Sequence, residues 1–221
     1  MPAQGGISKP VPFHSKGTLM STTLTTPQRS LRWRVVDIVV AAVIAVASGL
    51  IFVGWNVGTE IPRHALEALL PGLQGLFNGG WLFAGVLGGL VIRKPGAALF
   101  VALVAALLSA LVGNQWGPLT LVSGAAQGLG AELVFLAFLY GNFRLYVAML
   151  SGALAGLATA INDLVIWYPG ADVPFATIYI VTSIVSGIVI AGIGSWALAR
   201  ALAATGALNR FAAGREGRSD V

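Results

Sequence analysis

The sequence predicts an all-α integral membrane protein, a compact bundle of six transmembrane helices. Of its 221 residues, 57% are hydrophobic and only 10% are charged, whereas soluble domains carry about 25% charged residues. The apolar runs that begin near residue 35 approach the length of about 20 residues needed to cross a bilayer. A spanning segment must satisfy its own backbone hydrogen bonds, and these runs lack the alternation of barrel strands, so helices are expected.

Six spans are expected in chain order, separated by turn-forming residues. They lie at approximately 35–57, 74–92, 96–112, 119–140, 145–167 and 176–200. The long connection after the first span is expected to hold a short interfacial helix that begins after Pro62, with Ile61, Leu66, Leu69 and Leu70 on one face.

The chain divides into a membrane domain and two tails. Residues 1–30 are rich in Gly, Pro, Ser and Thr, which predicts a disordered cytoplasmic tail, and Met20 is a second candidate start. The membrane domain covers 31–205, and 206–221 form a cytoplasmic C-terminal tail. A cleaved signal peptide is the competing interpretation of the first apolar run, but this run continues through Phe52 and is too long for one.

The basic residues predict the orientation of the bundle, because Lys and Arg are retained on the cytoplasmic side. With both termini cytoplasmic, 12 of the 13 Lys and Arg residues lie inside and only Arg63 lies outside. The expected location is therefore the bacterial cytoplasmic (inner) membrane, with multiple passes. The same distribution accounts for the net charge of +5, so no nucleic-acid partner is expected, and the basic residues can also attract anionic lipid.

Pairs of glycines at four-residue spacing predict close helix packing, since small residues let backbones approach one another in lipid. These pairs are Gly85 and Gly89, Gly124 and Gly128, and Gly152 and Gly156.

Several kinds of chemistry have no support in the sequence. There is no Walker A pattern, so any ATP must be used by another subunit. The chain has no cysteine, and its two histidines, His14 and His64, lie in the tail and in an external loop. A metal site or a Ser/His catalytic site is therefore not expected.

Ionisable residues at membrane depth mark a functional site by default, because they are costly there. Asp37, Glu132 and Asp163 qualify, and Asp37 is expected to serve the start of the first helix. Asp163 has no Lys or Arg in its own span. For Glu132 the alternative is a protonated carboxyl group that is hydrogen-bonded within the bundle.

Polar and aromatic residues gather toward the external side, which predicts a pocket open to the exterior. The candidate ligand-binding residues are Trp55, Asn78, Asn114, Trp116, Gln127, Glu132, Asn162, Asp163, Trp167 and Tyr179. Two alternatives remain open, since tryptophans also form interfacial belts and polar side chains also join helices.

Four segments carry a resemblance to a known family. They are 34–39 (Arg-Val-Val-Asp-Ile-Val), 92–98 (Ile-Arg-Lys-Pro-Gly-Ala-Ala), the 113–117 loop, and 127–133 (Gln-Gly-Leu-Gly-Ala-Glu-Leu). Over about 31–200, the chain resembles the S components of energy-coupling factor (ECF) transporters, and among them the YkoE-type subunit for hydroxymethylpyrimidine or thiamine.

The resemblance implies a subunit that captures a vitamin from outside and is not an enzyme. Its implied partners are a membrane coupling (T) protein and two ABC-type ATPase subunits that use ATP, with no cofactor in this chain. It also implies that small residues on the first helix, here Ala41, Ala45 and Gly49, dock against the coupling protein; packing within the bundle is the alternative.

The ligand stays open between two chemical types. A cationic thiazolium favours a nearby carboxylate and aromatic faces, whereas a neutral pyrimidine needs paired donors and acceptors. The alternative function is a small membrane enzyme or scaffold with a polar site in the outer leaflet.

Overall fold

The computed structural model describes residues 31–208. The predictions for the tail 1–30, for Met20 as a start and for 209–221 lie outside the described residues. Within the described range the secondary structure is entirely helical. The elements are α1 (Val35–Leu69), η1 (Leu73–Phe77), α2 (Gly79–Ile92), α3 (Ala97–Val112), η2 (Gly117–Leu119), α4 (Thr120–Ala137), α5 (Leu145–Ile166), α6 (Val173–Ser186), η3 (Gly187–Gly194) and α7 (Ser195–Ala204).

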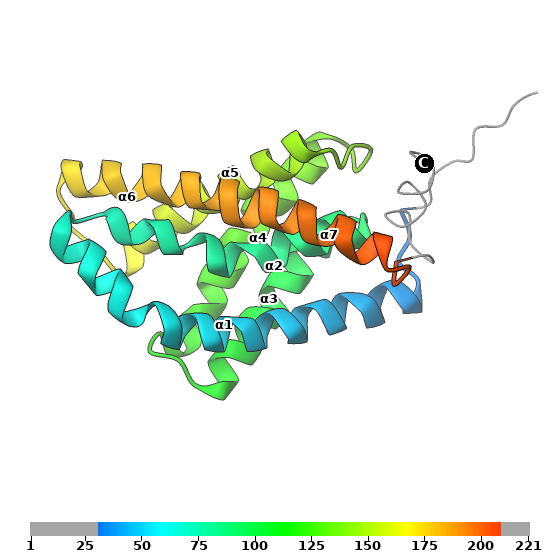
Figure 1. Ribbon diagram of the computed structural model, residues 1–221, viewed down its shortest axis with the longest axis horizontal. Helices are drawn as coiled ribbons and strands as arrows, with labels where there is room; N and C mark the ends of the chain where they lie inside the picture. Colours follow the sequence, from blue (N-terminus) through cyan, green and yellow to red (C-terminus); the bar gives the residue numbers. More distant parts are fainter. Residues whose placement is uncertain (1–30, 209–221) are drawn as a thin grey trace, which may run out of the picture. The chain divides into compact units, whose positions relative to one another are not determined.

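These elements match the six expected spans. Five helical segments of the described chain are long and apolar enough to cross a membrane, and α3 is a shorter apolar helix of 16 residues. The last span consists of α6, η3 and α7, which run on as one helical segment from Val173 to Ala204 with a π-helical stretch in its middle. Figure 1 shows this span and α1 as the two long helices. The protein is thus a multi-pass membrane protein.

The first helix differs from the expectation of a separate helix after Pro62. α1 continues without a break through Pro62 to Leu69, 35 residues in all, which is about 50 Å at 1.5 Å per residue. A proline removes a single backbone donor, and the remaining hydrogen bonds on both sides keep the helix continuous. Its last turns therefore extend beyond the length of one span.

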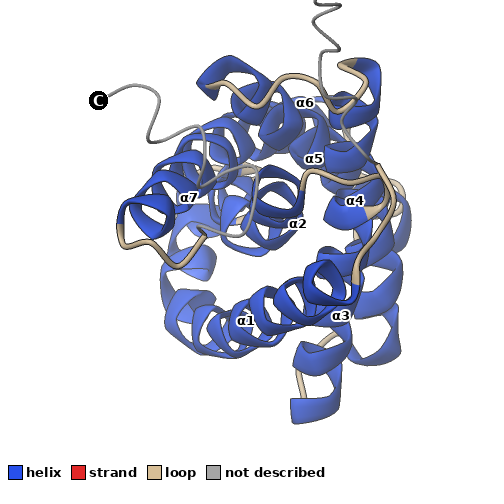
Figure 2. Cartoon of the chain, turned by 90° about the vertical axis from the view of Figure 1, so that its right-hand side faces the viewer, coloured by secondary structure: helices blue, strands red, loops and turns tan. Residues whose placement is uncertain are grey.

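α2 lies at the centre of the bundle. All of its residues except Trp81 and Phe83 are buried, and it contacts α1, α3, α4, α5, η3 and α7. Figure 2 shows α2 inside a ring of the other helices. A helix that is apolar on every side suits this position.

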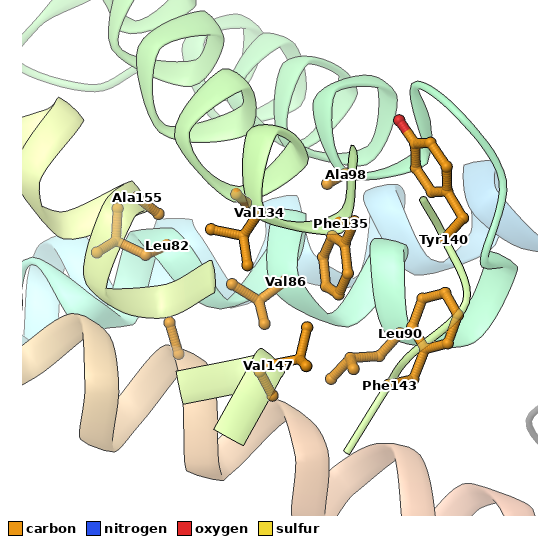
Figure 3. Close-up of a cluster of buried hydrophobic side chains, with 13 residues drawn as sticks. Leu82, Val86, Leu90, Ala98, Val134, Phe135, Tyr140, Phe143, Val147 and Ala155 are labelled. Carbon is orange, nitrogen blue, oxygen red and sulfur yellow. The ribbon is translucent and has the colours of Figure 1, made fainter. Parts of the chain in front are cut away.

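The apolar core on one side of α2 joins it to α4 and α5. Leu82, Val86 and Leu90 pack with Phe135 and Val147, as Figure 3 shows. Glycines bring these helices close together: a Cβ on Gly130 would lie 2.7 Å from the Leu154 carbonyl oxygen, and on Gly128 it would lie 2.9 Å from Ala102 Cβ. The packing role predicted for the three glycine pairs at four-residue spacing is confirmed, since each of these six glycines faces a neighbouring helix.

The two ends of the bundle differ in composition. One end, here called the Arg93 end, holds the start of α1, the α2–α3 turn and the α4–α5 turn. All described Lys and Arg residues except Arg63 lie in the half of the bundle nearer to this end. Asp37 is fully buried there, 3.0 Å from the Arg34 guanidinium and 3.6 Å from Lys94 Nζ, which is the structural role expected for it. The opposite end, here called the Trp116 end, holds the end of α1, the α3–α4 loop and the α5–α6 loop.

Candidate functional site

A cavity of about 400 Å³ lies at the Trp116 end, within the size range of ligand pockets. All six spans or their flanking loops contribute side chains to it. The lining residues are Phe52, Arg63, Asn78, Trp81, Ala106, Ser109, Asn114, Gln115, Trp116, Thr120, Ser123, Gln127, Thr159, Asp163, Trp167, Tyr168 and Tyr179. The cavity is therefore formed by the tertiary arrangement and not by any one helix.

One wall of the cavity is a hydrogen-bonded chain around Asp163. The Tyr179 hydroxyl donates to Asp163 Oδ2 at 2.7 Å and accepts from Asn78 Nδ2 at 3.0 Å. Asn162 Nδ2 donates to Asp163 Oδ1 at 3.1 Å and to the Ser123 hydroxyl at 3.0 Å. These partners hold the carboxylate in place, and an ionised carboxylate with two oxygens retains capacity to accept further bonds from a ligand.

A second wall contains Trp81 and Trp116, and Trp55 packs on Trp81; the rings meet edge to face. The ring centroids of Trp55 and Trp81 are 6.5 Å apart, and those of Trp81 and Trp116 are 5.5 Å apart. Trp81 Nε1 donates to Asn56 Oδ1 at 2.7 Å, which fixes the central ring. Flat ligands can stack on such faces.

Asn114 organises the loop that carries Trp116. Its Oδ1 accepts from the backbone N–H groups of Trp116 at 3.0 Å and Gly117 at 2.9 Å, and from the Thr120 hydroxyl at 3.0 Å. Its Nδ2 donates to the Ser109 hydroxyl at 3.1 Å. Asn114 therefore positions Trp116 by closing the turn before α4.

The Arg63 side chain lines the cavity because α1 continues past Pro62. Its Cζ lies 5.7 Å from the centre of the Trp116 ring, and it interacts electrostatically with Asp163. The distribution of basic residues along the sequence predicts Arg63 alone on the outer side but indicates no role for it in the site. Its place in the same cavity as a carboxylate 100 residues later depends on the tertiary fold.

Two buried polar groups line the cavity close to the middle of the bundle. Gln127 is 6% exposed and Thr159 is 7% exposed. Thr159 Oγ1 has no hydrogen-bond partner among the described residues. An unpaired buried hydroxyl is costly, so a ligand atom or a water has a reason to bind there.

Tyr168, in the α5–α6 loop, also lines the cavity and packs on Tyr179 with 5.4 Å between ring centres. Burial raises the pKa of Tyr168, so its hydroxyl remains protonated and able to donate. Neither Tyr168 nor Thr159 was among the predicted contacts. The sequence context of a threonine in an apolar helix, or of a tyrosine in a turn, does not by itself indicate a ligand-binding residue.

Three comparisons with known proteins each match the chain to transport proteins. The model of a family described as "ABC-type cobalt transport system, permease component" matches residues 36–158. A curated relative, "Putative HMP/thiamine permease protein YkoE" of Bacillus subtilis (strain 168), is 35% identical over 185 residues, covering 83% of this chain and 92% of the relative. A solved structure, "Crystal structure of an S-component of ECF transporter", matches with a TM-score of 0.78 at 34% identity, over 86% of this chain and 95% of the other.

The chain belongs to the YkoE-type family of ECF S components. It is therefore the substrate-binding subunit of an ECF transporter and not an enzyme, which confirms the prediction from the sequence. ECF transporters consist of such a subunit, a coupling protein and ATPases, so ATP is used outside this chain. The described residues contain no cluster of three or more His, Cys, Asp or Glu side chains that could hold a metal ion.

The structure brings most of the predicted binding residues of the S component together. Those that line the cavity are Asn78, Asn114, Trp116, Gln127, Asp163, Trp167 and Tyr179. Asn162 and Trp55 do not line it but support residues that do. Asn162 holds Asp163, and Trp55 packs on Trp81 and donates its ring N–H to the Phe77 carbonyl at 3.1 Å.

The prediction for Glu132 requires a correction, because Glu132 neither lines the cavity nor holds a residue that does. It lies toward the Arg93 end, where Oε1 accepts from the Gly96 N–H at 2.7 Å and Oε2 from the Ala98 N–H at 2.8 Å. The Tyr140 hydroxyl also donates to Oε1 at 2.7 Å, and burial and the adjacent carboxylate raise the pKa of Tyr140. The carboxylate thus accepts hydrogen bonds from N–H groups at the start of α3 that have no partner within the helix. A helix N-terminus also favours a negative charge beside it.

The proposed docking stripe also requires a correction. Ala41 and Ala45 are fully buried, and Gly49 is buried against α3, where an added Cβ would lie 2.8 Å from Leu108 Cβ. The alternative stated for this stripe, packing within the bundle, is therefore the one observed. Small residues at this spacing let α1 approach α3 closely, and they are not accessible to a partner.

Proposed function

We propose that this S component binds thiamine or its hydroxymethylpyrimidine precursor in the cavity at the Trp116 end. The observation that carries the proposal is a partly buried carboxylate, Asp163, held by hydrogen bonds between aromatic walls in a cavity of about 400 Å³. The similarity to the YkoE relative, whose printed name includes HMP and thiamine, supports the same ligand class.

The chemistry of the walls suits a flat heterocycle with polar edges. Trp116, Trp167 and Tyr168 offer ring faces, and Gln127 and Thr159 offer donors and acceptors deeper in the cavity. A carboxylate accepts hydrogen bonds from ring-bound amino groups and attracts a cation. These properties match a pyrimidine and a thiazolium, respectively.

We further propose that the Trp116 end faces the exterior of a bacterial cytoplasmic membrane and that both termini are cytoplasmic. The support is the distribution of the described Lys and Arg residues, which lie in the half of the bundle at the Arg93 end except for Arg63. In this orientation the subunit receives its ligand from outside. It delivers the ligand through a T protein driven by two ABC-type ATPase subunits.

Calorimetry on detergent-purified protein tests the ligand proposal. We expect Asp163→Asn and Trp167→Ala to weaken binding of thiamine, hydroxymethylpyrimidine or both. Loss of a charge-assisted hydrogen bond costs about 1.5–3 kcal/mol, or about one to two decades in Kd. The matched control is Glu60→Gln, a carboxylate change at an exposed position of α1 outside the cavity. Unchanged affinity for both ligands in both folded variants would refute the proposed site.

A further inference from the structure

The cavity contains two opposite formal charges. Among the described residues that line it, Arg63 and Asp163 are the only charged ones, and the others are neutral. The two attract each other across the cavity. The carboxylate on its own would make this an anionic site, but together with Arg63 it makes a site with a net charge of zero.

Arg63 also occupies one of the aromatic faces. Its guanidinium carbon lies 5.7 Å from the centre of the Trp116 ring, within the distance of about 6 Å at which a cation is attracted to a tryptophan face. A cationic ligand would be attracted to this same face of the Trp116 ring. In this structure the protein's own cation is already there.

We infer that Arg63 is a specificity-determining residue that makes the cavity favour an uncharged heteroaromatic ring over a cationic one. The inference rests on the proposed function and chooses between its two ligand types. A cation that approaches Asp163 meets repulsion from the guanidinium, or must displace it from the Trp116 ring face. An uncharged ring leaves this contact in place, and discrimination by such a repulsive element is a general route to specificity.

The neighbouring residue provides a matched control. His64 is exposed and lies 3.5 Å from Glu67 on the same helix, and it does not line the cavity. Arg63 is only partly exposed. Substitutions at these two adjacent positions therefore separate an effect in the cavity from a general effect on the end of α1.

The experiment measures the ratio of the Kd values for thiamine, a cation, and hydroxymethylpyrimidine, which is uncharged. Calorimetry is performed on the purified wild-type chain and on Arg63→Lys, Arg63→Gln, Arg63→Glu and His64→Gln. We expect Arg63→Gln to strengthen thiamine binding by about tenfold, equivalent to about 1.4 kcal/mol, and to change hydroxymethylpyrimidine binding by less than about twofold. Arg63→Glu shifts the ratio further in the same direction, while Arg63→Lys and His64→Gln leave it close to that of the wild type.

The possible outcomes separate this inference from the proposed function. If the wild type binds both ligands and the ratio stays the same in Arg63→Gln and Arg63→Glu, the role of Arg63 is wrong while the proposed function stands. Weaker binding of both ligands in these variants also overturns it, because Arg63 would then be a direct contact. If the wild type binds neither ligand, the proposed function fails and the inference fails with it.

Discussion

Replacing Glu132 with glutamine should destabilise the protein and leave its ligand affinity unchanged. The Glu132 carboxylate accepts from Gly96 N–H, Ala98 N–H and the Tyr140 hydroxyl, at 2.7, 2.8 and 2.7 Å, and from Leu99 N–H at 3.4 Å. An amide has one acceptor oxygen and one donor nitrogen, so in Glu132→Gln one set of these donors faces an NH2 group.

The expected loss follows from these contacts. A hydrogen bond to a charged group contributes about 1.5–3 kcal/mol, and a buried donor left without a partner costs about 1–3 kcal/mol. We take about 3 kcal/mol for the loss of one strong acceptor position. At about 2–4 °C per kcal/mol for a chain of this size, this lowers the Tm by about 6–12 °C.

The assay is thermal unfolding of the purified protein in detergent, together with calorimetry well below the Tm. Tyr140→Phe is the graded comparison, because it removes a single donor and leaves the three backbone bonds, so we expect a smaller decrease in Tm of about 2–4 °C for about 1 kcal/mol. Both variants should bind ligand with the Kd of the wild type. A Glu132→Gln variant with an unchanged Tm and a tenfold weaker Kd would refute this reasoning and return Glu132 to the binding site.

The packing of α1, the cavity and the lack of a nucleotide-binding motif in the sequence each lead to a further testable expectation. Ala45→Trp should prevent folding, because Ala45 is fully buried, and the protein should lose its monodisperse peak in size-exclusion chromatography. Val43→Trp is the control and should be tolerated, because Val43 is 62% exposed. A folded Ala45→Trp variant that binds ligand but fails in uptake would instead support docking. Thr159→Val should weaken ligand binding by about twofold to tenfold, because one hydrogen bond contributes about 0.5–1.5 kcal/mol. The Tm should not fall, since Thr159 Oγ1 has no described protein partner. A lower Tm with an unchanged Kd would contradict this expectation. Liposomes that contain only this chain and no ion gradient should not accumulate labelled thiamine above equilibrium, since the sequence has no nucleotide-binding motif; accumulation there would refute the transport scheme.

The sequence by itself determined the helical spans and the packing glycines. In a bilayer the backbone has few alternatives to a helix, so length and hydropathy were enough to place six segments, and the structure has helices at each of them. The Gly124 and Gly128 spacing predicted close contact because a missing side chain has the same effect whichever helix lies opposite. The identity of the opposing helix, α3, was not predictable from the spacing.

Only the tertiary structure decided which polar residues meet. Glu132 and Asp163 are both carboxylates in apolar helices, and their sequence contexts do not distinguish a helix cap from a cavity wall. Glu132 meets the N–H groups of Gly96 and Ala98 because α3 begins beside α4. Asp163 accepts a hydrogen bond from Tyr179 of α6 and shares the cavity with Arg63, which comes from the extended end of α1. Burial, hydrogen bonding and charge pairing depend on distances between segments far apart in the chain, and the local pattern of a sequence does not contain these distances.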